Sequence, residues 1–293
     1  MPILELLSFT GSNTAAAFVT ATGVGTDSAT IRNFNGPRAS ILQLWGQSTA
    51  PSEYQVLGPE LHDTQSGSLR GQFRGLGGST GLTLSGAAGA VGTVSDFLLP
   101  MEFEQPLNPQ QNLTIKVKGG IAPAPVNVVD LALGVGMLVY YDNVPGITQR
   151  LISPEEVKSK LVNLLGATVL TASGLQYSTT STALNGGGGF PSFRNNTDYA
   201  ILGYTTAIDT LSVGIKSTAS GNLHWGGPGT SLTPGVTRNL FVTLSRLYGR
   251  PLIPVINSAD AASTFIETCN STGGAVQAQV SLNLAQLGSP ASV

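Results

Sequence analysis

The sequence has few charged side chains. Asp, Glu, Lys and Arg together make up 10% of the residues, against roughly 25% in an average globular protein. The formal net charge is −2, and the largest basic cluster, Lys116 with Lys118, is too small for the positive surface that binds nucleic acid. We therefore expect no direct nucleic-acid binding. The shortage of charge also favours a protein whose surface is covered by neighbouring subunits.

Cysteine and long apolar runs are scarce as well. Because Cys269 is the one cysteine, no disulfide can form within the chain, as is typical of proteins made in a reducing compartment. The longest apolar stretch, residues 126–141, is interrupted by Asn127 and Asp130, so no membrane-spanning helix of about 18 apolar residues is predicted. The start of the chain, Met-Pro-Ile-Leu-Glu, lacks the basic and apolar segments of a signal peptide.

The sequence does contain many short β-type segments separated by turn residues. The 37 glycines and 17 prolines are spread along the chain, which suits tight turns between short strands. In residues 113–118 apolar and polar side chains alternate, as in a strand with one buried and one solvated face. This pattern indicates an all-β protein. Strands are predicted over residues 38–45, 98–103, 113–118, 126–133, 135–141, 199–205, 210–216, 240–244, 252–256, 264–268 and 275–284.

One segment is predicted to be helical. Ser153 can cap the helix, Pro154 suits its first position, and Glu156 follows the cap by three residues, which together form a capping box. Apolar side chains follow at helical spacing at Val157, Leu161, Leu164 and Leu165, and Gly166 can end the helix. We therefore predict one short helix, running to about Leu165 and packed through Val157, Leu161 and Leu164, near the middle of the chain.

The sequence also contains an internal repeat at an offset of 154 residues. The segment Leu98-Leu99-Pro100-Met101 matches Leu252-Ile253-Pro254-Val255, and Ser66-Gly67-Ser68-Leu69 matches Ser220-Gly221-Asn222-Leu223. A further match, Ser40-Ile41-Leu42 with Ala200-Ile201-Leu202, lies at an offset of 160. Low-complexity β sequence can resemble itself by chance, but a constant offset over several patches favours tandem duplication. Superposition of the two copies should place Pro100 over Pro254.

The repeat predicts two domains of one architecture. The first unit would span residues 1–150, the linking helix residues 151–167, and the second unit residues 168–293. Each unit has room for about eight strands, which suits a jelly-roll β-barrel or a related antiparallel sandwich. Solenoids have much shorter periods, and two copies would not close a propeller.

Two such units in one weakly charged chain resemble the double jelly-roll major capsid proteins of tailless icosahedral double-stranded DNA viruses, including bacteriophages with an internal membrane. The resemblance covers the whole chain as architecture, and its carriers are the strand–turn–strand segments 98–117 and 252–269. It implies a structural virion protein, synthesised in the host cytoplasm, whose homotrimers of pseudo-hexagonal outline tile the capsid shell. The implied partners are further copies of the chain, minor capsid or vertex proteins, and the internal viral membrane, which it would contact peripherally.

Residues suited to catalysis are few, and we expect no enzyme. His62 and His224, the two histidines, lie near no nucleophile motif, and they are not clustered as metal ligands are. Glu102 and Glu104 would share one strand face, where paired carboxylates could hydrolyse glycans. The repeat does not preserve this pair, so a solvated strand face is the simpler interpretation.

Two binding hypotheses remain as alternatives to a shell protein. Loop oxygens of Asp142, Asn143 and Asp209 could bind calcium, although Asp and Asn are also common in turns, and we predict no metal or cofactor. Aromatic side chains could form a sugar-stacking platform in a glycan- or receptor-binding module such as an adhesin or spike, although aromatics on strands more often fill a core or a subunit contact. These aromatic residues are Trp45, Trp225, Tyr140 and Tyr141.

Overall fold

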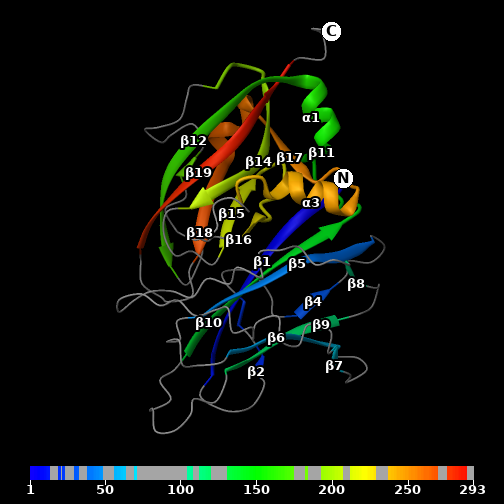
Figure 1. The fold of residues 1–293 in the computed structure, drawn as a ribbon, viewed down its shortest axis with the longest axis vertical. Coiled ribbons are helices and arrows are strands. Elements are labelled where there is room, and N and C mark those ends of the chain that lie inside the picture. Colours follow the sequence, from blue (N-terminus) through cyan, green and yellow to red (C-terminus); the bar gives the residue numbers. More distant parts are fainter. Residues whose placement is uncertain are drawn as a thin grey trace.

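The computed structural model describes residues 1–13, 19–20, 22–23, 30–32, 38–48, 56–63, 69–70, 104–107, 112–119, 131–174, 182–183, 193–206, 212–228, 237–269 and 276–288. Strands dominate these residues and helices are few, so the prediction of an all-β fold is confirmed. No sheet formed by the described strands closes into a barrel. Figure 1 shows the first half of the chain below and the second half above.

The first half forms two separate sheets. The first sheet has the order β3-β1-β10-β5-β8, with β1 at Ile3–Asn13, β3 at Thr22–Gly23, β5 at Ala39–Ser48, β8 at Gln105–Leu107 and β10 at Leu131–Tyr141. The second sheet has the order β2-β9-β6-β7, with β4 also paired to β9. Its strands are β2 at Val19–Thr20, β4 at Thr30–Arg32, β6 at Val56–Asp63, β7 at Leu69–Arg70 and β9 at Asn112–Gly119.

The second half forms one nine-stranded sheet in the order β11-β17-β14-β19-β12-β18-β15-β16, with β13 also paired to β18. Its two parts are joined by a short parallel pairing of β12 with β18, at Ser173 and Gly174. The strands are β11 at Arg150–Ile152, β12 at Leu161–Gly174, β13 at Thr182–Ala183, β14 at Asp198–Thr206, β15 at Ser212–Ser217, β16 at Trp225–Pro228, β17 at Ile253–Asn257, β18 at Thr264–Cys269 and β19 at Val276–Leu287.

Both halves use the same order of strands. We count β2 and β4 as one interrupted strand because both pair with β9, and we leave the two-residue β3 out of the count, since it pairs only with β1 at the edge of the first sheet. We then number the strands of each half by their order along the chain. In the first half, the sheet β1-β10-β5-β8 contains the first, eighth, third and sixth strands, and the sheet β4-β9-β6-β7 contains the second, seventh, fourth and fifth. The strands β12-β19-β14-β17 and β13-β18-β15-β16 repeat both orders in the second half.

A β-bulge recurs at the same place in both halves. The pairing of β5 with β10 skips Leu42, and the pairing of β14 with β19 skips Leu202. The two leucines are 160 residues apart, which is the offset at which Ser40-Ile41-Leu42 matches Ala200-Ile201-Leu202. A bulge is a specific local departure from regular pairing, so its recurrence fixes which residues of the two halves are equivalent.

The first sheet is buried on both faces at the positions whose side chains the structure describes. Because side chains alternate along a strand, one face of β1 and β10 carries Ile3, Leu7, Met137, Val139 and Tyr141, all buried. The other face contributes to a core that includes residues from the second half. The first-half members of this shared core are Leu4, Leu6, Leu42, Leu138 and Tyr140.

Most of the predicted strands that fall on described residues are present. The segments at 38–45, 113–118, 135–141, 199–205, 210–216, 252–256, 264–268 and 275–284 lie almost wholly within β5, β9, β10, β14, β15, β17, β18 and β19. The predicted strand at 98–103, with Pro100, lies outside the described residues, as do residues 126–130 of another. The long strand β1 was not predicted.

The predicted helix is only partly right. Ser153 does cap helix α1, accepting a hydrogen bond from the backbone nitrogen of Glu156 at 3.1 Å, but α1 spans only Pro154–Lys160. The chain then continues as β12, paired along β19, so Leu161 and Leu164 are exposed rather than packed beneath a helix. Pairing with a distant strand has overridden the helical spacing. The predicted linker range 151–167 therefore includes the start of a strand.

The predicted strand at 240–244 is wrong, and the chain has a further helix there. Helix α3 spans Leu240–Tyr248 and buries Leu240, Phe241 and Leu244 on one side. Gly249, with a φ of 60°, ends it in the left-handed conformation that glycine adopts most easily. A short 3-10 helix follows β17 at Ser258–Ser263. Figure 1 shows α3 at the level where the two halves meet.

Candidate functional site

The contact between the two halves, which we call the seam, holds several polar side chains that come from distant parts of the sequence. The backbone nitrogen of Leu6 donates to the carbonyl oxygen of His224 at 2.8 Å. On the same strand, the hydroxyl of Ser8 donates to that of Ser212 at 2.9 Å, and this hydrogen bond is buried. Strand β1 therefore contacts the second half through both backbone and side chains.

The other side of the seam is formed by the end of α3. Tyr248 donates from its hydroxyl to the carbonyl oxygen of Leu42, the bulged residue of β5, at 2.6 Å. Arg250 makes an ion pair with Glu104 at 2.8 Å and lies over the ring of Tyr140, 4.9 Å from its centroid. A second oxygen of Glu104 accepts from Ser40 at 2.5 Å. These contacts attach the second half to strands β5 and β10.

Ser245 positions the arginine. Its hydroxyl donates to the carbonyl oxygen of Arg250 and accepts from the backbone nitrogen of Leu252 at 3.1 Å. The backbone nitrogen of Arg250 donates in turn to the carbonyl oxygen of Ser245 at 3.2 Å. The backbone of the turn that follows α3 and carries Arg250 is thus held by one buried serine.

His224 belongs to a second polar group, on the sheet of the second half. Glu267 of β18 is buried, and its two carboxylate oxygens contact Lys216 at 2.5 Å and His224 at 2.7 Å. Burial alone would raise the pKa of Glu267, but the hydrogen bonds and charges of His224 and Lys216 outweigh it and hold that pKa below its usual range. The group ties β15, β18 and the start of β16 together.

The other residues proposed for chemistry are not brought together. Glu104 is engaged in the seam, and Glu102 lies outside the described residues, as does Asp209. His62 lies in β6 of the first half, opposite Thr114 of β9, whereas His224 directly precedes β16 in the second half. Asn143 accepts from the Met1 amino group at 2.8 Å. Within the described part of the chain, no group of three or more His, Cys, Asp or Glu side chains could hold a metal ion.

The described aromatic side chains proposed as a sugar platform are buried. Trp225 is 1% exposed and packs edge-on against Phe241, with ring centroids 5.9 Å apart. Tyr140 and Tyr141 are 7% and 2% exposed, and burial is the main cause that raises the pKa of Tyr140 to about 12. The side chain of Trp45 is not among those described. These rings therefore fill the two cores instead of facing solvent.

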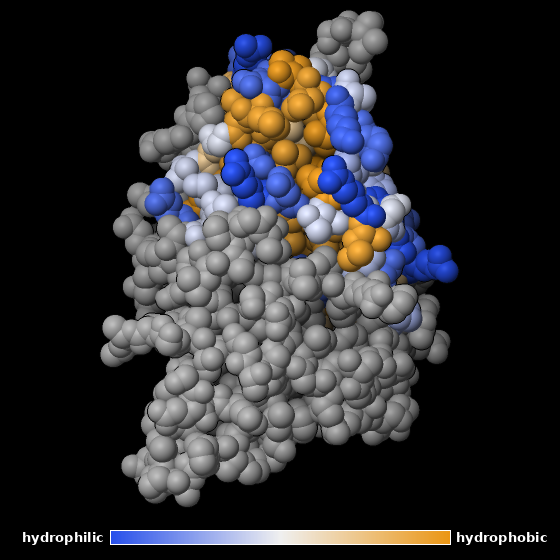
Figure 2. All heavy atoms as spheres, viewed as in Figure 1, coloured by the Kyte–Doolittle hydropathy of each residue, from blue (hydrophilic) through white to orange (hydrophobic). Residues whose placement is uncertain are grey.

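The second half carries an open groove that sequence analysis missed. It has a volume of about 620 Å³ and lies over β12, β14 and β19, beside the residues that lead into α3. Figure 2 shows an apolar surface on the upper part of the molecule, where Figure 1 places β12 and β19. Leu161, Val162 and Leu164 of β12 are 43%, 57% and 58% exposed. The groove is lined by Leu164, Leu165, Gly166, Leu202, Thr205, Arg238, Asn239, Ser281, Leu282 and Asn283.

Neither the seam nor the groove could have been found from motifs, because each forms from segments that are far apart in the sequence.

No helix of the described residues is long and apolar enough to cross a membrane. No protein-family model matches the sequence, and no curated protein matches it. The strand order, the seam and the groove are the features that bear on function.

Proposed function

We propose that this chain is a structural virion protein, built from two tandem jelly rolls, that forms an icosahedral capsid shell. The observation that carries the proposal is the strand order found in both halves. A jelly roll joins its first, eighth, third and sixth strands in one sheet and its second, seventh, fourth and fifth in the other. Both halves follow this order over their described strands. Tandem duplication of one jelly roll would explain the order, the shared bulge and the sequence match at an offset of 160 together. At β8 and β17 the pairing matches Pro106 with Val255, an offset of 149 and not the 154 of the sequence repeat.

The way the halves meet favours assembly into a ring. The first half contributes its first sheet to the seam, and the second half contributes strand β16 and helix α3. The two halves thus meet through different surfaces, which makes the contact heterologous. Contacts of this kind generate closed rings when the rotation between units is suitable. Three chains would supply six similar lobes, which gives a homotrimer of pseudo-hexagonal outline. Such a trimer can tile a shell.

A structural role without catalysis fits the described side chains. Glu104, His224 and Glu267 are engaged in contacts that hold strands or halves together. We propose as partners further copies of the chain, minor capsid or vertex proteins, and the internal viral membrane at its periphery, and no nucleic acid. The protein would be made in the host cytoplasm and reside in the virion.

Native mass spectrometry and light scattering over a range of protein and salt concentrations test this proposal. We expect a homotrimer that persists at high salt, because a chain with 10% charged residues has few ion pairs for salt to screen. A chain that stays monomeric at high concentration would contradict the shell function. A monomer that also binds a glycan array would favour the alternative, a glycan- or receptor-binding module.

A further inference from the structure

We propose that the groove over β12, β14 and β19 is the docking surface for the first half of a second copy of this chain. The inference rests on the proposed trimer and names the surface that forms it. The groove and the first-half surface buried in the seam occupy equivalent positions in the two halves.

The strand pairing sets this equivalence residue by residue. Starting from the shared bulge, the registers across β10 and β19 match Leu4 with Leu164 and Leu6 with Gly166. The bulge itself matches Leu42 with Leu202, and the same registers match Leu138 with Asn283. All four second-half residues of these pairs line the groove. Their four first-half equivalents all belong to the core shared across the seam.

The two equivalent surfaces differ in what covers them. In the first half Leu4, Leu6 and Leu42 are at most 1% exposed, because the second half lies on them. In the second half Leu164 is 58% exposed, and no part of the described chain lies on it. In the seam, this surface of a first half is covered by a second half. We therefore expect the equivalent surface of a second half to be covered by a first half, supplied by a neighbouring chain.

The outer edge of β12 supports the same conclusion. The equivalent strand of the first half is β1, and at its outer edge the backbone nitrogen of Leu6 donates to the carbonyl oxygen of His224 across the seam. The equivalent edge of β12 pairs with no described strand between Leu161 and Ala172, since β18 joins only at its end. An open strand edge with exposed Leu and Val side chains invites pairing with another chain. A repeat of the seam would occupy both the edge and the groove.

The repeat also indicates which part of the second copy docks. Strand β16 provides the seam contact to β1, and β7 holds the same place in the strand order of the first half. The sequence repeat at an offset of 154 matches Leu61 of β6 with Ile215 of β15. Leu61 pairs with Arg70 of β7 and Ile215 pairs with Trp225 of β16, so the pairing matches Leu69 with His224, one residue from the sequence match of Leu69 with Leu223. We therefore expect Leu69 of one subunit to lie next to Gly166 of another. Each of the three subunits would make this contact once, which closes the ring.

The variant Leu164→Glu tests the docking surface, and Leu247→Glu is its matched control. Leu247 on α3 is 47% exposed and does not line the groove. A charge on the docked surface would be buried without a partner, so Leu164→Glu should raise the trimer dissociation constant at least about 100-fold. Leu247→Glu should leave it within about threefold of wild type. Native mass spectrometry gives the oligomer, and circular dichroism shows that each variant is folded.

The outcomes separate this inference from the proposed function. A wild-type trimer with a folded monomeric Leu164→Glu variant supports the docking surface. A trimer that tolerates Leu164→Glu, or that is disrupted equally by Leu247→Glu, would overturn the docking surface and leave the shell function standing. A wild-type chain that never associates would overturn both.

Cysteine cross-linking provides a test that does not depend on disrupting the protein. Cys269 is buried, and a Cβ added at Gly166 meets no atom within 4 Å, so a cysteine fits there. The double variant Gly166→Cys, Leu69→Cys should form covalent dimers and trimers under oxidising conditions, seen by electrophoresis without reductant. Each single variant should stay monomeric on the same gel. A wild-type trimer whose double variant forms no cross-link would contradict the proposed register.

Discussion

Glu104 and Arg250 come from opposite halves of the chain, and their side chains meet at 2.8 Å in the seam. The ion pair is partly exposed, so it should contribute less than about 1 kcal/mol by itself, and the stacking of Arg250 on Tyr140 adds roughly the same amount. We expect Arg250→Ala to lower the free energy of unfolding by about 1–2 kcal/mol. Denaturant titration measures this change.

The matched control for this variant is Arg246→Ala, because Arg246 is an exposed arginine on the same helix. Its loss should change the free energy of unfolding by less than about 0.5 kcal/mol. Equal effects of the two substitutions would show that the ion pair and the stacking contact do not stabilise the seam.

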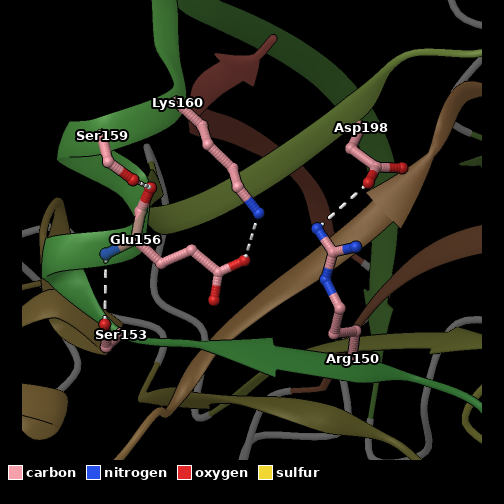
Figure 3. A network of polar contacts seen from close by, with 6 residues as sticks. All are labelled: Arg150, Ser153, Glu156, Ser159, Lys160 and Asp198. Carbon is pink, nitrogen blue, oxygen red and sulfur yellow. Dashed lines mark hydrogen bonds and ion pairs between the residues drawn. The ribbon is translucent and has the colours of Figure 1, made fainter. Parts of the chain in front are cut away.

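The cap of α1 gives a second prediction. Figure 3 shows Ser153 below the first turn, with its hydroxyl directed at the backbone nitrogen of Glu156. Ser153→Ala removes this hydrogen bond and should cost about 1 kcal/mol. Ser159 on the same helix is exposed, and its hydroxyl donates to the carbonyl oxygen of Glu156 at 2.9 Å. Because that carbonyl can bond water instead, Ser159→Ala should cost under about 0.5 kcal/mol in the same thermal melts.

Gly203 should tolerate no side chain. A Cβ at this position would lie 2.2 Å from the carbonyl oxygen of Thr237 and 2.5 Å from that of Arg238, both backbone atoms that cannot rotate away. We expect Gly203→Ala to lower the free energy of unfolding by at least about 2 kcal/mol. Gly166→Ala, where the added carbon meets nothing, should fold like the wild type. A Gly203→Ala protein that melts at the wild-type temperature would rule out this close approach of the segment before α3.

Glu267 makes stability depend on pH in a definite direction. Its pKa in the folded protein lies below the ordinary value of 4.5, because His224 and Lys216 stabilise the carboxylate. The contribution of this carboxylate is therefore complete above about pH 5 and is lost as the pH falls through the folded-state pKa. Glu267→Gln should destabilise the protein at pH 7 by roughly 3 kcal/mol and flatten its stability profile below about pH 5.

Glu155, exposed on α1, provides the comparison for this charge change. Glu155→Gln should lower stability by no more than about 1 kcal/mol, as expected for a surface charge near a helix start. If Glu267→Gln retained the full acid sensitivity of the wild type, the buried carboxylate would not be its source.

Features that depend on neighbouring residues could be predicted from the sequence. The capping box at Ser153 is one, and the alternation that marks β9 is another. The end of α1 could not be predicted, because β12 is held by pairing with β19, more than a hundred residues later. Helix α3 was mistaken for a strand because Phe241, Val242 and Thr243 also suit a strand. The spacing of its buried side chains, followed by Gly249, was the local pattern that would have identified it.

The candidate sites were less accessible to sequence analysis than the fold. The match of Ser40-Ile41-Leu42 to Ala200-Ile201-Leu202 pointed to the repeat, but nothing in it marked Leu42 and Leu202 as bulged residues. The seam pairs Glu104 with Arg250, and no local pattern connects such distant positions. Glu102 and Glu104 were considered together for their spacing, whereas the structure shows that Glu104 has its partners in Ser40 and Arg250.

Electron microscopy of the purified protein shows directly whether the chain forms trimeric capsomers. We expect particles with threefold symmetry and six lobes in a pseudo-hexagonal outline, which associate side by side into sheets or closed shells as concentration rises. Single two-lobed particles at every concentration, or rings with a different number of subunits, would contradict this expectation.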